Sequence, residues 1–346
     1  MLFQFNKLFA AFALISMLLA CEAEQKPTMI DLAGKTMGTT YHISYRDSLG
    51  RNLQSSIDSL LRVINQEVST YIPDSRISQF NRSDSGIFIP ATVPNYFAHN
   101  LKLSGLVYGH SGGWFNPCVM PLVRYFNFGP DKKELLKIDS SLVDSLQKLV
   151  NFDAVSVAED AKGVFIRKNI PRLEVDFSAI AKGDACDQLG ILLESRGLRN
   201  YMVEIGGEVR ARGFLSKGFG WMVGINRPTE EASTKDMQVI VELQDLSLAT
   251  SGNYRNFHEV NGVKYAHTIN PFTGYPERNT LLSVSIFAKD CGFADALATA
   301  AMAMGLKRAE EMLHRLEGVE AYFIYSDDTG KMQTRFTDGL KNIIKD

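Results

Sequence analysis

The sequence predicts an α+β fold built from largely antiparallel sheets flanked by helices. Strand patterns come in runs along the chain, and no regular alternation of strand and helix is present. Beyond residue 30 there is no internal repeat, low-complexity stretch or clear linker. Although 346 residues would allow two domains, we therefore expect residues 31–346 to form one compact unit.

The first half of the chain predicts one strand and two helices. Residues 39–45 alternate polar and apolar side chains, the pattern of a half-buried strand. Residues 53–68 place leucine, isoleucine and valine at helical spacing, which predicts an amphipathic helix. A second helix is expected over residues 93–108, ended by the glycines that follow Tyr108.

The second half predicts mostly short strands. Strands are expected over residues 163–170 and 173–177, on either side of Pro171, and a helix over residues 182–196. An alanine-rich helix is expected over residues 293–304. The remaining predicted strands are residues 201–205, 209–213, 220–225, 239–243 and 281–287.

The composition is that of a globular protein, with 45% hydrophobic and 22% charged residues. The formal net charge is −2. No basic excess exists to neutralise a phosphate backbone, so nucleic acid is not an expected partner.

The first twenty residues predict a signal peptide. Lys7 precedes an apolar run over residues 8–20, which is too short to span a bilayer. The run ends in Ala20-Cys21 and resembles a bacterial lipobox, so we expect cleavage before Cys21 and a lipid on that cysteine. Residues 21–30 would then tether the protein to the outer side of the cytoplasmic (inner) membrane, facing the periplasm or the outside. The alternative is an ordinary signal peptide with an incidental cysteine.

Three further cysteines, Cys118, Cys186 and Cys291, lie far apart in the sequence. They form neither a CxxC motif nor a metal-ligand spacing, and an odd number cannot pair internally. We expect buried free thiols.

Asp295 and Thr299 predict a cation site near the C-terminus. They are four residues apart on the alanine-rich helix, so their side chains share one face. Both offer oxygen, the ligand atom that Mg²⁺ prefers. The alternative is structural: Asp295 caps the helix start and Thr299 bonds back to the Asp295 carbonyl.

The segment from Asp176 to Lys182 has the order strand, short loop and helix start. A helix N-terminus presents free N–H groups that suit a pyrophosphate, and Lys182 adds a cation there. Asp176 could accept a hydrogen bond from a ligand N–H. The alternative is a helix start capped by Asp176 or Ser178, with Lys182 in solvent.

Other polar turns leave two interpretations open. The Gly206-Gly207 and Gly252 turns allow close approach of a ligand but also suit plain hairpins, and neither matches a dinucleotide or P-loop motif. His267 lies at a strand end and is either a base or a structural hydrogen-bonding residue.

Taken together and in order, these segments resemble the ApbE family of FAD:protein FMN transferases. The resemblance covers nearly all of the chain after residue 30 and implies an ApbE-like (T-fold-like) architecture. Its pieces are residues 35–41, 69–71, 74–81, 113–117, 176–183, 206–207, 249–254, 267–274 and 294–299.

The resemblance assigns roles at matching positions. It implies a Mg²⁺ site made by the Ala179 carbonyl, Asp295 and Thr299. It also implies FAD contacts at Met37, Tyr71, Trp114, Phe115, Asn116, Asp176, Lys182 and Ile269. Asn116 departs from the aspartate common in the family, which puts the contact at that position in doubt.

The implied activity is Mg²⁺-dependent transfer of FMN from FAD to a threonine or serine hydroxyl of a redox protein, with release of AMP. Asp295 is expected to be essential, and His267 is a candidate base. Two alternatives share the site: hydrolysis of FAD to FMN and AMP, and non-catalytic binding of FAD by a lipoprotein.

Overall fold

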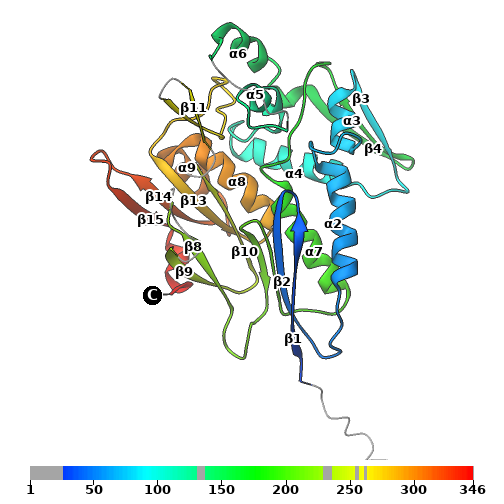
Figure 1. Cartoon of the computed structure of the whole chain (residues 1–346), viewed down its shortest axis with the longest axis vertical. Helices are drawn as coiled ribbons and strands as arrows, with labels where there is room; N and C mark the ends of the chain where they lie inside the picture. Colours follow the sequence, from blue (N-terminus) through cyan, green and yellow to red (C-terminus); the bar gives the residue numbers. More distant parts are fainter. Residues whose placement is uncertain (1–25, 131–136, 229–235, 254–256, 261–262, 346) are drawn as a thin grey trace, which may run out of the picture.

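The computed structural model describes residues 26–130, 137–228, 236–253, 257–260 and 263–345 (Figure 1). The predicted signal peptide, its lipobox and Cys21 lie outside the described residues, as does the part of the Gly252 turn that follows Asn253.

An eight-stranded sheet forms the centre of the fold. Every pair of neighbouring strands in it is antiparallel, which confirms the predicted sheet type. In spatial order its strands are β1 (Thr28–Thr36), β2 (Thr39–Asp47), β6 (Tyr201–Ile205), β7 (Glu208–Arg212), β10 (Leu246–Gly252), β13 (Leu281–Ala288), β14 (Glu320–Ser326) and β15 (Met332–Phe336).

Three smaller antiparallel sheets surround it. Their members are β16 (Ile344–Lys345), β9 (Met237–Leu243) and β8 (Trp221–Asn226); β3 (Gly86–Pro90), β5 (Gly163–Lys168) and β4 (Val155–Asp160); and the hairpin of β11 (Phe257–Val260) with β12 (Val263–Ala266).

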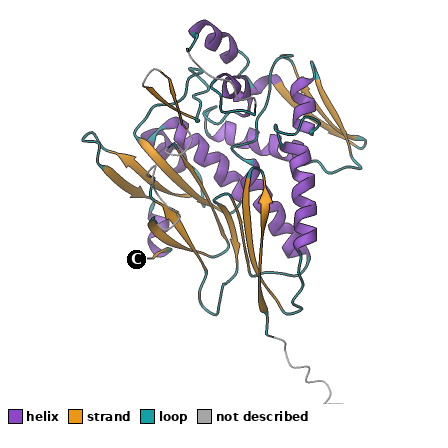
Figure 2. Cartoon of the chain, in the orientation of Figure 1, coloured by secondary structure: helices purple, strands orange, loops and turns teal. Residues whose placement is uncertain are grey.

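Helices cover one face of the main sheet, with α7 and α8 directly against it and α2 and α4 outside them (Figure 2). The helices are α2 (Gln54–Val68), α3 (Arg76–Arg82), α4 (Tyr96–His110), α5 (Met120–Tyr125), α6 (Ser140–Gln147), α7 (Ala181–Ser195), α8 (Cys291–Met304) and α9 (Leu306–Leu313). Short 3-10 turns are η1 (Pro117–Val119), η2 (Phe152–Ala154) and η3 (Asp338–Asn342).

The strand pattern places one hydrophobic cluster on each face of the main sheet. In β2, Tyr41, Ile43 and Tyr45 are buried toward the helices, as their alternation predicts. Val209 and Ala211 of β7 point the other way, into a second cluster shared with the small sheet of β8 and β9. Glu208 and Arg210 alternate with them and therefore face α7.

The predicted strand over residues 173–177 is wrong. Leu173, Val175 and Phe177 are buried as a strand pattern requires, but the segment is irregular. The backbone N–H and carbonyl of Val175 bond to the side-chain amide of Asn81 at 2.8 and 2.9 Å. A side chain thus replaces the neighbouring strand, which periodicity alone does not reveal. The other predicted elements are present, with boundaries shifted by a few residues.

Cys118, Cys186 and Cys291 are buried free thiols, as predicted. No helix within the described ranges is long and apolar enough to cross a membrane.

Candidate active site

The first turns of α7 and α8 meet at unusually close range. The Gly183 N–H donates to Oδ2 of Asp295 at 3.2 Å. A Cβ on Gly183 would lie 2.4 Å from the Cys291 carbonyl oxygen, well inside van der Waals contact. Glycine at this position therefore allows the two helix starts to touch and brings the Asp295 carboxylate to the N-terminus of α7.

Lys182 lies between two buried carboxylates. Its Nζ is 3.2 Å from Oε1 of Glu208 and 3.8 Å from Oδ2 of Asp295. Glu208 is 4% and Asp295 3% exposed, whereas the Lys182 side chain keeps 26% of its surface accessible. The cluster thus joins α7, α8 and the first residue of β7, and Lys182 does not extend into solvent.

Opposing effects set the pKa values of this cluster. Burial raises the pKa values of Glu208 and Asp295, while the Lys182 charge opposes this effect by lowering both pKa values. Burial alone would lower the pKa of Lys182, but the charges of Asp295 and Glu208 outweigh it and raise that pKa. A cation held beside these carboxylates would relieve the cost of burying them.

The donors around Asp295 fit a hard cation. Thr299 lies one turn further along α8, and its Oγ1 is 3.3 Å from Oγ of Ser251 in β10. Ala179 lies two residues before α7 begins. Oε2 of Glu208 is buried and has no hydrogen-bond partner among the described residues. Carboxylate, hydroxyl and carbonyl oxygens are the ligands of Mg²⁺.

Among the residues that the structure describes, there is no group of three or more His, Cys, Asp or Glu side chains that could bind a metal ion. A donor set of one carboxylate, one hydroxyl and one carbonyl agrees with this observation, because it contains only one such residue.

Asp295 and Thr299 do not have the structural roles left open by the sequence. The N-cap of α8 is Asp290, and the Asp295 carboxylate accepts from another helix instead. Thr299 contacts Ser251 across to β10.

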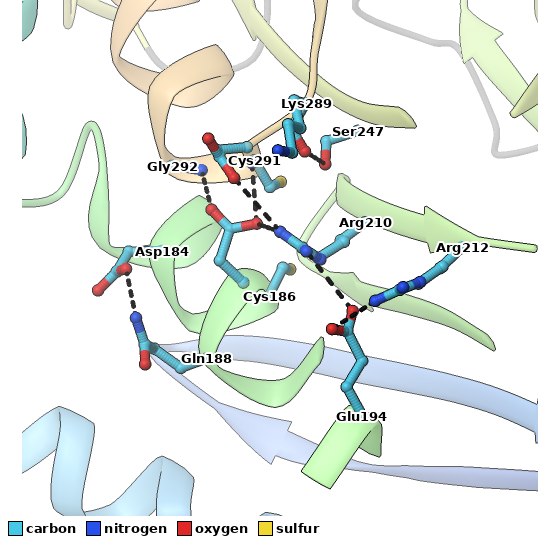
Figure 3. Close-up of polar contacts among 12 residues, drawn as sticks. Asp184, Cys186, Gln188, Glu194, Arg210, Arg212, Ser247, Lys289, Cys291 and Gly292 are labelled. Carbon is cyan, nitrogen blue, oxygen red and sulfur yellow. Dashed lines mark hydrogen bonds and ion pairs between the residues drawn. The ribbon is translucent and has the colours of Figure 1, made fainter. Parts of the chain in front are cut away.

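A charged network around Arg210 braces the helix junction beside Cys291 and Gly292 (Figure 3). The Asp187 carboxylate accepts from the N–H groups of Cys291 and Gly292 at 3.0 and 2.9 Å, at the very start of α8. Arg210 of β7 donates to Asp187 at 2.5 Å and lies 3.7 Å from Glu194 on α7. A charged network therefore fixes α8 to α7 one turn from Lys182.

Trp114 lies in an aromatic and cationic surrounding. Its ring is 5.0 Å from that of Phe272 at 71°, an edge-to-face contact, and the Arg308 guanidinium lies 5.1 Å from its centroid. Phe115 is buried in the core, so a ligand contact at this residue would fall to its backbone.

Asn116 lies in the turn that connects the Trp114 segment to Asp176. Its Oδ1 accepts from the Cys118 N–H at 2.9 Å and caps η1. The next carbonyl, that of Pro117, accepts from the Asp176 N–H at 2.8 Å. The amide of Asn116 thus has a local structural role that an aspartate carboxylate could also fill.

Asp176 does not cap α7. Its Oδ1 accepts from the N–H and Oγ of Ser178 at 3.0 and 2.7 Å, while the N-cap of α7 is Ile180, without a side-chain cap. Burial raises the pKa of Asp176. Tyr71 is 62% exposed, and partial burial, followed by the charge of Asp176, raises the pKa of its hydroxyl.

Met37 occupies the turn between β1 and β2, with φ of 48°. The Gly206 N–H donates to the Thr40 carbonyl at 3.1 Å, which places this turn against the glycine turn that precedes Glu208. A surface pocket of about 500 Å³ is lined by residues 35–40.

His267 and Ile269 belong to the part of the fold built on α5 and α6. Ile269 is 6% exposed and packs with Leu122, Phe126 and Val143. The His267 ring lies 6.3 Å from that of Phe128. The structure brings Lys182 and Asp295 together directly, with Thr299 one turn further along α8. It connects the Trp114–Asn116 stretch to Asp176 through the Pro117 carbonyl.

Glu208 is a residue of this cluster that the sequence patterns do not single out, because it directly follows the Gly206-Gly207 turn. The sequence does contain one indication of its role: Glu208 is a charged residue at the start of a strand in which every second residue is apolar.

Comparisons with known proteins agree on one family. The model of the ApbE family matches residues 37–323. The chain is 38% identical to the FAD:protein FMN transferase of Vibrio cholerae over 86% of this chain and 87% of that protein. It is 33% identical to that of Haemophilus influenzae over 94% and 95% of the two chains.

Solved structures similar to this chain also belong to ApbE proteins. The flavin transferase ApbE from Vibrio cholerae superposes with a TM-score of 0.80 at 32% identity, covering 92% of this chain and 99% of that one. The flavinyl transferase ApbE of Pseudomonas stutzeri, in its apo form, gives 0.80 at 28% identity over 92% and 97%. The chain therefore belongs to the ApbE family.

Proposed function

We propose that this protein is a flavin transferase that moves FMN from FAD onto a threonine or serine hydroxyl of a redox protein and releases AMP. The observation that carries the proposal is the buried cluster of Lys182, Glu208 and Asp295 at the meeting point of α7 and α8, in a chain of the ApbE family.

The reaction exchanges a phosphoanhydride bond of FAD for a phosphoester bond to the acceptor. The acceptor oxygen bonds to the FMN phosphorus, the bond between that phosphorus and the bridging oxygen breaks, and AMP leaves with the bridging oxygen. The hydroxyl proton passes to a base, for which His267 is the candidate. Negative charge grows on the bridging oxygen as the bond breaks.

Lys182 and the N-terminus of α7 supply positive charge where this negative charge develops. Lys182 carries its charge on an ammonium held in place by Glu208 and keeps part of its surface accessible. The N-terminus of α7 adds the partial positive charge of the helix dipole. These groups are fixed before the substrate arrives, which is the arrangement that favours the transition state.

Ala179, Asp295 and Thr299 would hold Mg²⁺ at this position. When bound, the ion would neutralise pyrophosphate charge and orient the two phosphates. The rest of FAD would lie along Met37, Tyr71, Trp114, Asp176 and Ile269. Trp114 offers an aromatic surface for the flavin or adenine ring.

We further propose that a lipid on Cys21 anchors the protein to the cytoplasmic membrane, with its acceptor on the same side. The support is the apolar run that ends at this cysteine. A Cys21→Ala protein is expected to leave the membrane fraction, and full retention there would contradict the anchor.

The transfer is tested by incubating the soluble part of the chain with FAD, Mg²⁺ and a redox-protein domain made without its flavin. Intact-mass spectrometry is expected to show the acceptor heavier by one FMN unit. Free FMN and AMP with unmodified acceptor would indicate hydrolysis instead, and intact bound FAD would indicate a carrier.

A further inference from the structure

We propose that Glu208 is a positioning residue of the flavin-transfer reaction, which holds the Lys182 ammonium beside Asp295. This inference rests on the proposed function and adds a residue to it. Glu208 is the first residue of β7 and follows the Gly206-Gly207 turn.

The strand places Glu208 in the site with little freedom. Val209 and Ala211 pack into the cluster on the opposite face of the sheet, so Glu208 and Arg210 point toward α7. Arg210 contacts Asp187 on α7, which confirms the direction of this face. With only 4% of its surface exposed, Glu208 is confined to the space beside Lys182.

The geometry shows which carboxylate holds the lysine. Nζ of Lys182 is within hydrogen-bond distance of Glu208, at 3.2 Å, but 3.8 Å from Asp295. Glu208 therefore draws the ammonium away from a full contact with Asp295. Without the Glu208 charge, Asp295 is the other described carboxylate near Nζ of Lys182. The ammonium would then pair with Asp295 and occupy carboxylate oxygens that the reaction needs.

The second carboxylate oxygen supports a functional role. Oε2 of Glu208 is buried with no hydrogen-bond partner among the described residues. Burying such an oxygen is costly, and a purely structural pair would be expected to satisfy it. A buried carboxylate oxygen left unpaired is therefore better explained by a role in the reaction than by a purely structural one.

A double-mutant cycle tests whether Glu208 acts through Lys182. The variants are Glu208→Gln, Lys182→Met and the two combined, each assayed for kcat and KM of flavin transfer and for FAD affinity in EDTA. We expect Glu208→Gln to lower kcat about 100-fold, and the double variant to be no slower than Lys182→Met alone, because coupled residues are not additive.

The control is Glu242→Gln, which removes the carboxylate of a half-buried pair with Lys345 at 2.7 Å, in the small sheet that packs on the opposite face of the main sheet. It is expected to transfer flavin at the wild-type rate. Thermal unfolding of every variant separates misfolding from loss of function. Should Glu208→Gln fail to fold, Glu208→Asp replaces it, since it keeps the charge and shortens the side chain by one methylene.

Two results overturn the inference: Glu208→Gln as active as Glu242→Gln, or losses that multiply in the double variant. A wild-type protein that transfers no flavin would instead contradict the proposed function, so the two failures are distinguishable.

Discussion

Replacing Gly183 by alanine should separate the two helix starts on which the site depends. The added Cβ would lie 2.4 Å from the carbonyl oxygen of Cys291 and 2.8 Å from Cα of Gly292. Both are backbone atoms, so no side chain can move aside. Restoring van der Waals contact requires α7 and α8 to part by ~1 Å, and such overpacking costs about 1–3 kcal/mol.

Two other effects change the free energy of unfolding of Gly183→Ala. Alanine is favoured over glycine inside a helix by up to about 1 kcal/mol. Separation would also lengthen the 3.2 Å hydrogen bond from Gly183 to Asp295, and a hydrogen bond to a charged group is worth about 1.5–3 kcal/mol. The expected net loss in free energy of unfolding is about 2 kcal/mol. Flavin transfer should fall at least about 10-fold, because shifts of ~1 Å misalign reacting groups.

Gly109 provides the matched control. It lies in α4, and a Cβ there would meet nothing within 4 Å. Gly109→Ala should leave flavin transfer unchanged and raise stability by up to about 1 kcal/mol. Urea unfolding followed by circular dichroism gives the free energies. A Gly183→Ala protein as stable and active as Gly109→Ala would refute the argument from close packing.

Three further predictions concern charge. Hydrogen bonds from Arg51 hold the pKa of Asp47 near 2, below its unfolded value, so its stabilisation is present above about pH 4 and lost as the pH falls toward 2. Asp47→Asn should therefore lower the free energy of unfolding by about 1–2 kcal/mol at pH 7 and by less than about 0.5 kcal/mol at pH 2 in urea titrations; a constant difference would contradict this. Arg210→Met leaves Asp187 buried without its cation and should cost about 3 kcal/mol by the same method, and wild-type stability would contradict the network. Flavin transfer should stop in EDTA and return with excess Mg²⁺; transfer undiminished by EDTA would exclude the proposed ion.

The sequence predicted most elements because their periodicity reflects one buried face. The α+β class and antiparallel sheets followed from runs of strands, and the proposed cation site rests on two oxygen side chains four residues apart. The failures have a common cause. Residues 173–177 are paired by the Asn81 side chain, and Glu208 reaches the site because β7 places it opposite α7. Both depend on contacts between segments distant in the chain, which local patterns do not encode.

The close approach of Gly183 to the backbone of Cys291 could not be predicted from the sequence for the same reason. A glycine near a helix start suggests only a weak helix, whereas the structure shows a contact with the backbone of Cys291. The family resemblance pointed to Asp295 and Lys182, but it did not reveal that Glu208 lies between Lys182 and the sheet.

We propose that Asp295 and the cluster around it transfer FMN to a protein. The most direct measurement is the intact mass of a flavin-free acceptor domain after incubation with FAD and Mg²⁺, using the wild type and Asp295→Ala side by side. We expect an acceptor heavier by one FMN unit with the wild type and an unmodified acceptor with Asp295→Ala. The Asp295→Ala protein is expected to stay folded. Equal flavinylation by both proteins would contradict it.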